Sequence, residues 1–225
     1  MESHAVTFQK VQSAISENVK LIAVTKTQPI AEIMEVYDYG HRIFGENKAQ
    51  ELQEKYELMP KDIEWHFIGH LQRNKVKYLT PFVSMIHSID SLRLLQEVNK
   101  SAKKNNRIVD CLLQFFIAEE ETKFGLDMDE ARELLTSESF MKMENIRICG
   151  VMGMATYTED TIQIRREFAH LKNIFDEIKA EFFANSPFFK EISMGMTNDC
   201  QIAIEEGSTM VRIGSAIFGE RNYSK

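Results

Sequence analysis

The chain alternates between two patterns of hydrophobic and polar positions. Short apolar stretches rich in β-forming residues predict strands. They cover Lys20–Lys26, Arg42–Gly45, Glu64–Ile68, Val83–His87, Ile108–Ile117, Ile146–Met152, Glu191–Met194 and Thr209–Ile213. Between them, helix formers recur at i, i+3 and i+4. That spacing predicts helices over Ile30–Tyr39, Lys48–Leu58, Ser91–Lys104, Asp129–Thr136 and Thr161–Phe183, after an opening helix around Ala5–Glu17.

About eight β-then-α units follow one another, which is the number that a closed parallel (β/α)8 TIM barrel requires. A doubly wound open sheet shows the same alternation and is the rival architecture. The first strand is not followed by a glycine-rich phosphate-binding pattern of the open-sheet kind. Glycine-containing turns instead follow the late strands, where barrels place a phosphate site. We therefore expect residues 1–225 to form a single α/β barrel domain with an N-terminal helix and no second domain.

Composition and charge narrow the function. The apolar fraction of 44% and charged fraction of 27% are those of a globular protein, and the net charge of −7 argues against binding nucleic acid or an anionic membrane. The three cysteines form no CxxC pair, and Cys111 and Cys149 lie in apolar stretches, which indicates small core residues. Neither a signal peptide nor an apolar stretch of roughly 20 residues is present. We expect a reduced, cytoplasmic protein.

A lysine follows four apolar residues at the end of the first predicted strand, in Leu21-Ile22-Ala23-Val24-Thr25-Lys26. In a barrel, the carboxyl ends of the strands carry the functional side chains. Lys26 is then either a surface lysine that reaches water or an amine at the barrel mouth. Partial burial there would lower its pKa, and a neutral amine attacks an aldehyde.

Two Gly/Ser turns follow the last two predicted strands. They are Ser193-Met194-Gly195-Met196 and Arg212-Ile213-Gly214-Ser215. Backbone N–H groups and hydroxyls at adjacent turns predict a phosphate site, whereas each turn alone would be an ordinary strand ending.

Other polar residues favour structural roles. His66, His70 and His87 lack a carboxylate pair at ligand spacing, which favours structural or loop histidines over a metal site. Glu120 and Lys123 belong to a charged stretch that we interpret as an exposed cluster.

Several segments together resemble the pyridoxal-phosphate homeostasis protein family (the YggS/PROSC group). The matching segments are Ala23-Val24-Thr25-Lys26-Thr27, Phe44-Gly45-Glu46-Asn47, Trp65-His66-Phe67-Ile68-Gly69, Leu71-Gln72, Asn74-Lys75, Lys123-Phe124-Gly125, Gly150-Val151-Met152, Ser193-Met194-Gly195-Met196, Asp199 and Gly207–Gly214. The resemblance implies a fold-type III barrel, similar to the N-terminal domain of alanine racemase, that binds pyridoxal 5′-phosphate (PLP).

The resemblance also implies roles for single residues. Lys26 would hold PLP as an internal aldimine, and Arg212 would face the pyridine nitrogen. Asn47 and Met152 match positions that line the cofactor pocket. The family's phosphate contacts correspond to Ser193, Gly195, Gly214 and Ser215. At the end of the fifth strand this chain has Phe116 where the family usually has Asn, so the role of that Asn is lost here.

The resemblance implies intracellular PLP homeostasis, meaning storage, buffering or delivery of the cofactor. The chain ends shortly after the last predicted strand, where racemases continue into a domain that supplies a catalytic tyrosine. We therefore expect a monomeric carrier without substantial turnover, with apo-PLP enzymes as acceptors. An amino-acid racemase is one alternative, and a phosphosugar isomerase or aldolase that uses a strand-end lysine without the cofactor is another.

Overall fold

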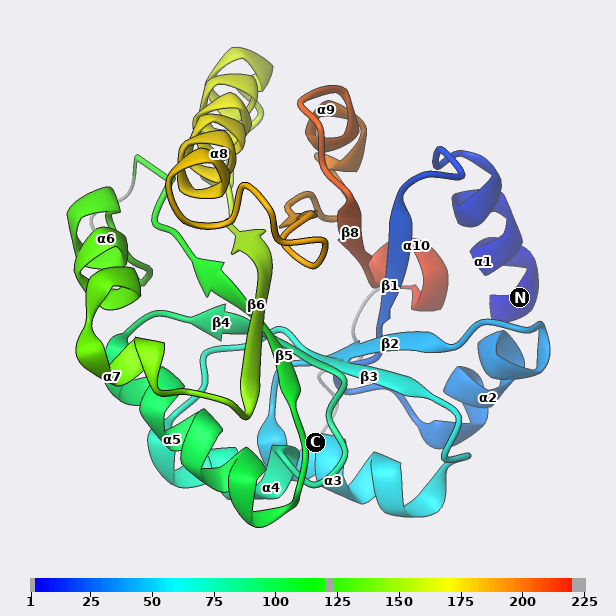
Figure 1. The fold of residues 1–225 in the computed structure, drawn as a ribbon. Helices are drawn as coiled ribbons and strands as arrows, with labels where there is room; N and C mark the ends of the chain where they lie inside the picture. Colours follow the sequence, from blue (N-terminus) through cyan, green and yellow to red (C-terminus); the bar gives the residue numbers. More distant parts are fainter. Residues whose placement is uncertain (1–2, 120–123, 220–225) are drawn as a thin grey trace.

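The eight strands form one closed, all-parallel barrel in the order of the sequence (Figure 1). The structure is a computed structural model and describes residues 3–119 and 124–219. The strands are β1 (Lys20–Val24), β2 (Ile43–Glu46), β3 (Glu64–Phe67), β4 (Met85–Ile89), β5 (Val109–Gln114), β6 (Ile146–Met152), β7 (Glu191–Ser193) and β8 (Met210–Ile213). The predicted TIM barrel is thus confirmed, and the open-sheet rival is wrong.

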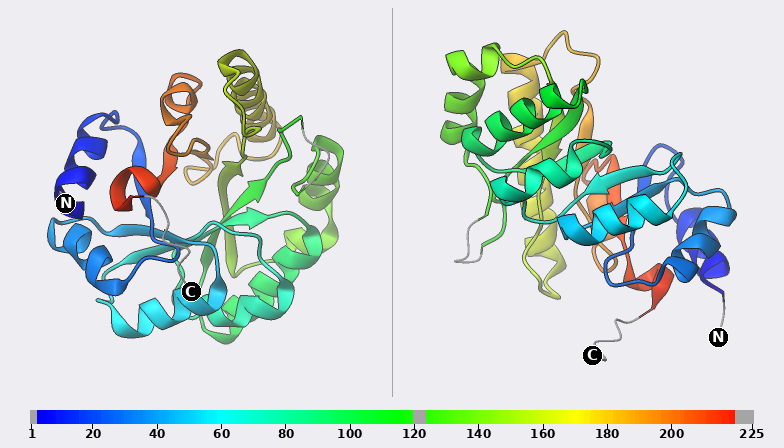
Figure 2. Two further views of the ribbon diagram at one scale, coloured as in Figure 1. Left: turned by 180° about the vertical axis from the view of Figure 1, so that it is seen from behind. Right: turned by 90° about the horizontal axis from the view of Figure 1, so that it is seen from below.

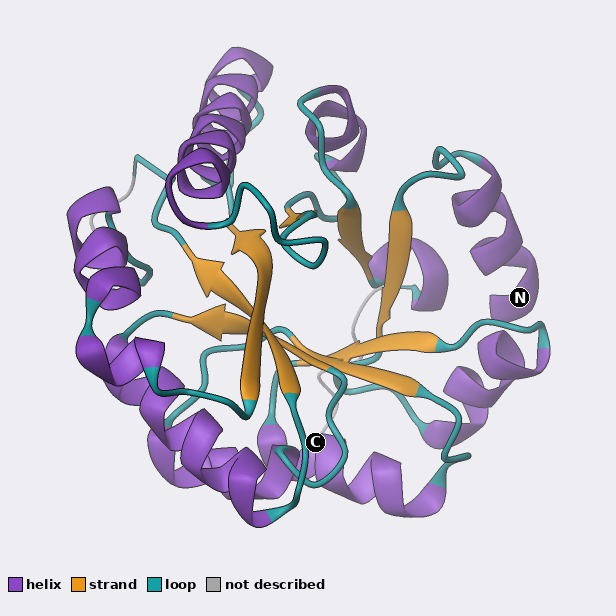
Figure 3. Ribbon diagram, in the orientation of Figure 1, coloured by secondary structure: helices purple, strands orange, loops and turns teal. Residues whose placement is uncertain are grey.

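Helices surround the strands on the outside, as three views show (Figures 1, 2 and 3). They are α1 (His4–Ser13), α2 (Ile30–Asp38), α3 (Ala49–Leu58), η1 (Arg73–Lys75), α4 (Val76–Leu79), α5 (Leu92–Lys104), α6 (Met128–Thr136), α7 (Glu138–Met141), α8 (Thr161–Phe182), α9 (Cys200–Glu205) and α10 (Ser215–Phe218). Helices α1 and α10 lie side by side, and the Thr7 hydroxyl donates to the carbonyl of Ile217 at 2.6 Å. No helix in the described ranges has the length and apolarity needed to cross a bilayer.

The predicted elements agree with the structure to within a few residues, with two kinds of difference. The opening helix ends at Ser13 rather than near Glu17, since a turn begins at Ala14. Five short helical segments are missing from the prediction: η1, α4, α7, α9 and α10. Each of them has three to six residues, so the hydrophobic period is too short to be read.

Alternation along each strand separates two apolar regions. Side chains that point outward pack under the helices and form the large core, which includes Cys111. The apolar part of the barrel interior is a smaller cluster of Ile22, Met85, Leu112, Cys149, Met152 and Met210. Toward the carboxyl ends of the strands the interior becomes polar, with His66, His87, Ser193 and Arg212 all buried. The two cysteines are core residues, as predicted.

Barrel closure brings the two ends of the sequence together. β1 pairs with β8, with Ile22 opposite Arg212 and Ala23 opposite Ile213. The segment that follows β1 and the turn that follows β8 therefore leave the barrel next to each other. This pairing places the strand-end lysine beside the late Gly/Ser turn.

We expect Gly150→Ala to destabilise the fold by about 4 kcal/mol or more. Gly150 has φ = +153°, and a Cβ there would lie 1.8 Å from the carbonyl oxygen of Glu191 on the neighbouring strand. Gly40→Ala is the matched control, because φ is +111° but no atom lies within 4 Å of the added Cβ. It should cost only about 1–2 kcal/mol. Urea unfolding measures both; equal losses would contradict the close approach of β6 and β7.

Candidate functional site

A cavity of about 470 Å³ opens at the carboxyl ends of the strands. Its lining includes side chains from β1, β5 and β8 and from the loops after β2, β3, β6 and β7. The lining residues are Val24, Lys26, Asn47, Ile68, Gly69, His70, Gln114, Phe124, Met154, Tyr157, Met196, Thr197, Asn198, Asp199, Arg212, Gly214 and Ser215.

Lys26 reaches the cavity because of strand alternation. Ile22 belongs to the interior cluster, and Val24 and Lys26 continue on the same side of the chain into the cavity. Thr25 points the other way, where it is fully buried behind the strand. The predicted amine at the barrel mouth is therefore where the sequence places it.

Arg212, on β8, is 4% exposed and borders the cavity. Its Nη1 donates to the carbonyl oxygen and the hydroxyl of Ser193, at 2.8 and 2.6 Å, and its Nη2 donates to the carbonyl of Gly153 at 3.1 Å. Burial lowers the pKa of Arg212 to about 10, so the guanidinium is still charged at neutral pH. Nε–H and one Nη2–H have no acceptor in the described part of the chain.

A chain of hydrogen bonds extends from Arg212 into the barrel. Ser193 Oγ lies 2.9 Å from His87 Nδ1, and His87 Nε2 lies 2.9 Å from His66 Nδ1. Because Arg212 can only donate, the arrangement that uses every hydrogen has Ser193 donate to His87 and His87 donate to His66. Burial lowers the pKa of His66 to about 3 and that of His87 well below its usual value, so both rings are neutral.

Two hydroxyls that border the cavity bond to each other. Ser215 Oγ donates to Thr197 Oγ1 at 3.2 Å, which joins the turns after β7 and β8. Gly214 lies between β8 and Ser215, and a Cβ there would be 3.2 Å from the carbonyl oxygen of Val24. The glycine lets this turn pass close to β1, so that the hydroxyl pair and Lys26 face one cavity.

Asn47 contributes an unsatisfied polar atom. Its Oδ1 is buried and has no hydrogen-bond partner among the described residues. Gly69 permits this placement, since a Cβ there would lie 2.3 Å from the carbonyl oxygen of Asn47. A buried acceptor without a donor is costly, and a ligand hydroxyl in the cavity would satisfy it.

The chain is similar to one family of known proteins over most of its length. The family described as alanine racemase, N-terminal domain, matches residues 5–222. A pyridoxal phosphate homeostasis protein of Aquifex aeolicus is 42% identical over 205 residues, which cover 91% of this chain and 88% of that protein. The human pyridoxal phosphate homeostasis protein is 38% identical and is covered to 78% of its length, with 92% of this chain.

The chain belongs to the pyridoxal phosphate homeostasis proteins within the alanine racemase N-terminal domain family. The family resemblance drawn from the sequence is confirmed.

Solved structures of the family show the same barrel. PipY of Synechococcus elongatus, solved with PLP bound, is 30% identical and has a TM-score of 0.84, with 96% of this chain and 100% of that chain covered. Alanine racemase from Bartonella henselae is 14% identical with a TM-score of 0.74, and 61% of that chain is covered. At that identity the racemase shares the fold alone.

The homeostasis-family barrel brings five of the eight predicted site residues to one cavity: Lys26, Asn47, Arg212, Gly214 and Ser215. The other three do not border it. Met152 belongs to the interior cluster, Ser193 is fully buried against Arg212, and Gly195 lies in the turn after β7, where a Cβ would be 2.6 Å from that of Ala203. The predicted cofactor contacts of all eight remain predictions. Glu120 and Lys123 lie outside the described residues.

Sequence reasoning missed several lining residues. β5 ends at Gln114, whose side chain borders the cavity, whereas Phe116 lies beyond the strand and does not. Alternation from Leu112 in the interior cluster would have indicated Gln114. Thr197 carried no signal of its own, because a threonine in a loop is common and only its contact with Ser215 distinguishes it.

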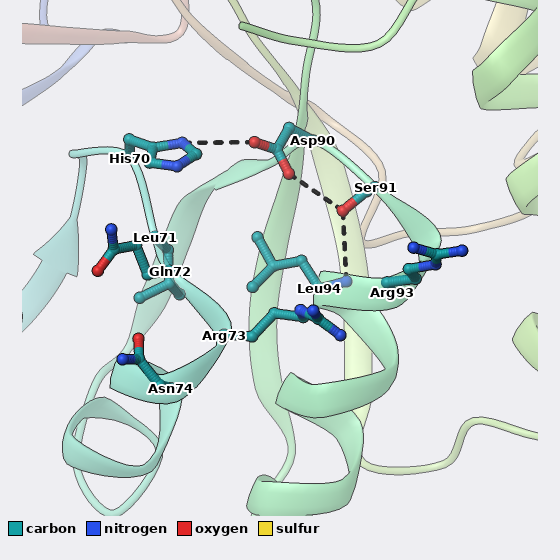
Figure 4. Close-up of a pocket in the computed structure, with 9 residues that line it drawn as sticks. All are labelled: His70, Leu71, Gln72, Arg73, Asn74, Asp90, Ser91, Arg93 and Leu94. Atoms are coloured by element: carbon teal, nitrogen blue, oxygen red, sulfur yellow. Dashed lines mark hydrogen bonds and ion pairs between the residues drawn. The ribbon is translucent and has the colours of Figure 1, made fainter.

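His70 also borders a second cavity, of about 670 Å³, and Figure 4 shows the residues that line it. It is a depression between the start of α5 and the segment after β3. His70 Nδ1 lies 3.4 Å from Asp90 Oδ2, and Ser91 donates to Asp90 and accepts from the Leu94 amide. Asp90 and Ser91 are thus engaged locally. Lys26, Arg212 and the hydroxyl pair all face the smaller cavity.

We expect the free energy of unfolding to fall as the pH drops from 6.5 to 5.5. Burial lowers the pKa of His66 to about 3 and that of His41 to about 4, against about 6.5 in an unfolded chain. Below pH 6.5 the unfolded chain therefore binds protons that the folded chain does not. The loss approaches about 1.4 kcal/mol per pH unit for each such histidine. Urea unfolding across this range measures it, and His41→Gln should reduce the slope; stability independent of pH would contradict neutral, buried rings.

Proposed function

We propose that this protein binds pyridoxal 5′-phosphate in the 470 Å³ cavity and acts in storing, buffering or delivering the cofactor. The observation that carries the proposal is the placement of Lys26, Arg212 and the Ser215–Thr197 hydroxyl pair around one cavity. An amine, a buried cation and a pair of hydroxyls match the aldehyde, the ring nitrogen and the phosphate of this one ligand. The relatives' names and the PLP bound in PipY support the same ligand.

The residues present fit the cofactor. The cavity volume lies within the range of roughly 300–1,000 Å³ that small-molecule sites show. The orphaned Asn47 Oδ1 offers an acceptor to the ring hydroxyl, and Gly214 and Ser215 offer backbone and hydroxyl donors to the phosphate. Bound PLP supplies an aldehyde that condenses with a primary amine, with loss of water. Lys26 is the amine that the cavity presents.

Arg212 argues for binding without turnover. A guanidinium stays protonated at neutral pH and donates hydrogen bonds, so it does not give a proton to a pyridine nitrogen. Ser193 and Gly153 hold its Nη atoms in place. An unprotonated ring nitrogen weakens the cofactor as an electron sink, which disfavours reactions that need a strong sink, such as transamination. Apo-PLP enzymes are the proposed acceptors and a monomer the proposed state. Colourless purified protein would instead favour the cofactor-free phosphosugar enzyme.

We expect borohydride reduction of the PLP-loaded protein to fix the cofactor on Lys26. Peptide mapping locates the label, and a label on another lysine would contradict the assignment. Lys26→Ala should abolish trapping but retain weakened PLP binding, because hydrogen bonds to the phosphate survive loss of the covalent link. Equilibrium dialysis measures that binding. Complete loss in a folded Lys26→Ala protein would contradict a separate phosphate site.

We expect the PLP-loaded protein to show negligible exchange of the α-proton of alanine in deuterated buffer. A guanidinium beside the ring nitrogen leaves that nitrogen unprotonated, so the ring withdraws electrons less and proton removal should be slow. Nuclear magnetic resonance measures the exchange, with D- and L-alanine tested separately. Exchange at the scale of typical enzymes, roughly 1–10³ s⁻¹, would identify a racemase or another PLP enzyme instead.

A further inference from the structure

One lysine, Lys55, is buried behind the segment that carries Lys26. Lys55 lies on α3 and is 5% exposed. Its ammonium group donates to three acceptors: the carbonyl of Thr25 at 2.7 Å, Glu46 Oε1 at 2.5 Å and Glu51 Oε1 at 2.8 Å. Each of its three N–H bonds therefore has an acceptor. This ion cluster, Lys55 with Glu46 and Glu51, does not border the cavity.

The ion cluster holds the chain on both sides of Lys26. Before it, the Thr25 carbonyl accepts from Lys55, and the Thr25 hydroxyl donates to Glu46 Oε1 at 2.8 Å. After it, the Thr27 amide donates to Glu51 Oε1 at 2.7 Å. The same Glu51 oxygen accepts from Lys55, so the two flanking contacts are joined through one ammonium group.

Thr27 needs such support. Its φ of +65° lies in the left-handed region, which costs a residue with a Cβ about 1–2 kcal/mol. Only Asn106 shares this conformation among the described non-glycine residues. The bond from Thr27 to Glu51 stabilises the conformation that turns the chain immediately after Lys26.

Burial of charge makes a purely structural role costly. Glu46 is fully buried, and desolvation raises the pKa of its carboxyl group. Buried ion pairs often stabilise a fold no better than apolar residues of the same size would. The ion cluster does, however, fix the course of the backbone around Lys26, because its bonds end on the peptide groups that flank this residue.

We propose that Lys55, Glu46 and Glu51 are positioning residues that fix the direction in which the Lys26 side chain enters the cavity. The inference rests on the proposed covalent link between Lys26 and PLP. When the ion cluster is intact, the amine is held where the aldehyde arrives. When it is broken, PLP still binds through its phosphate, but a smaller share becomes linked to Lys26.

The test separates total binding from covalent linkage. Glu51→Ala removes the acceptor of the Thr27 amide, and Glu51→Gln keeps an oxygen but loses the charge. Glu54→Ala, an exposed residue on the same helix without a bond to the Lys26 segment, is the matched control. Each variant is saturated with PLP. Bound PLP is counted after denaturation, and the share trapped on Lys26 is counted after borohydride reduction.

The linkage constant is the ratio of bound PLP that is linked to Lys26 to bound PLP that is not. We expect it to fall about tenfold in Glu51→Ala and about threefold in Glu51→Gln, because charge-assisted hydrogen bonds are roughly twice as strong as neutral ones. Total PLP bound should stay within twofold, and Glu54→Ala should match wild type. A purely structural role would lower thermal stability and total binding while leaving the trapped share unchanged. That unchanged share, in both Glu51 variants, would overturn the inference.

Two outcomes keep the inference distinct from the proposed function. Trapping on Lys26 in wild type with no change in the variants overturns only the positioning role. No trapping on Lys26 in wild type overturns the proposed link itself. If Glu51→Ala fails to fold, Glu51→Gln preserves the shape of the side chain and decides the matter alone.

Discussion

The parallel ladder between β1 and β8 is the contact on which the rest of the site depends. It joins the first and the last strand of the sheet, and it removes both of the edges that an open sheet would expose. It also sets Ile22 opposite Arg212, so the segment after β1 and the turn after β8 emerge together. This β1–β8 seam therefore places Lys26 on one side and Gly214 and Ser215 on the other side of the same cavity.

Polar groups on two sides of the barrel wall support this seam. Inside, Arg212 is held by Ser193 and Gly153, and the hydrogen bonds continue through His87 to His66. Outside, Lys55 holds Thr25 from behind. Both cations are buried; Lys55 has an acceptor for each of its N–H bonds, and the Nη atoms of Arg212 have three acceptors. Removing one partner of such a group strongly destabilises the fold, since a buried charge is then left unpaired. Loss of any one of these partners would therefore disturb the residues that border the cavity.

The mouth of the cavity differs from its floor. Phe124, Met154, Tyr157 and Met196 line it and are each more than a third exposed. The floor, in contrast, is close-packed and polar. Alanine racemases share the barrel at 13–14% identity, although this chain covers only 58–61% of their length. One barrel fold thus recurs in proteins of different length.

The sequence by itself determined the alternation of strands and helices, the number of strands and the strand-end position of Lys26. These follow from local patterns, because side-chain direction alternates along a strand and apolar residues recur along a helix. Only the tertiary structure decided which residues reach the cavity. Ser193 bonds to Arg212 and His87 and does not border the cavity, and Gln114 rather than Phe116 ends β5 at the cavity. The depth of a side chain in a barrel depends on the stagger of neighbouring strands. The contacts of Lys55 with Thr25 and of Thr197 with Ser215 join segments far apart in sequence, and no local pattern records such contacts.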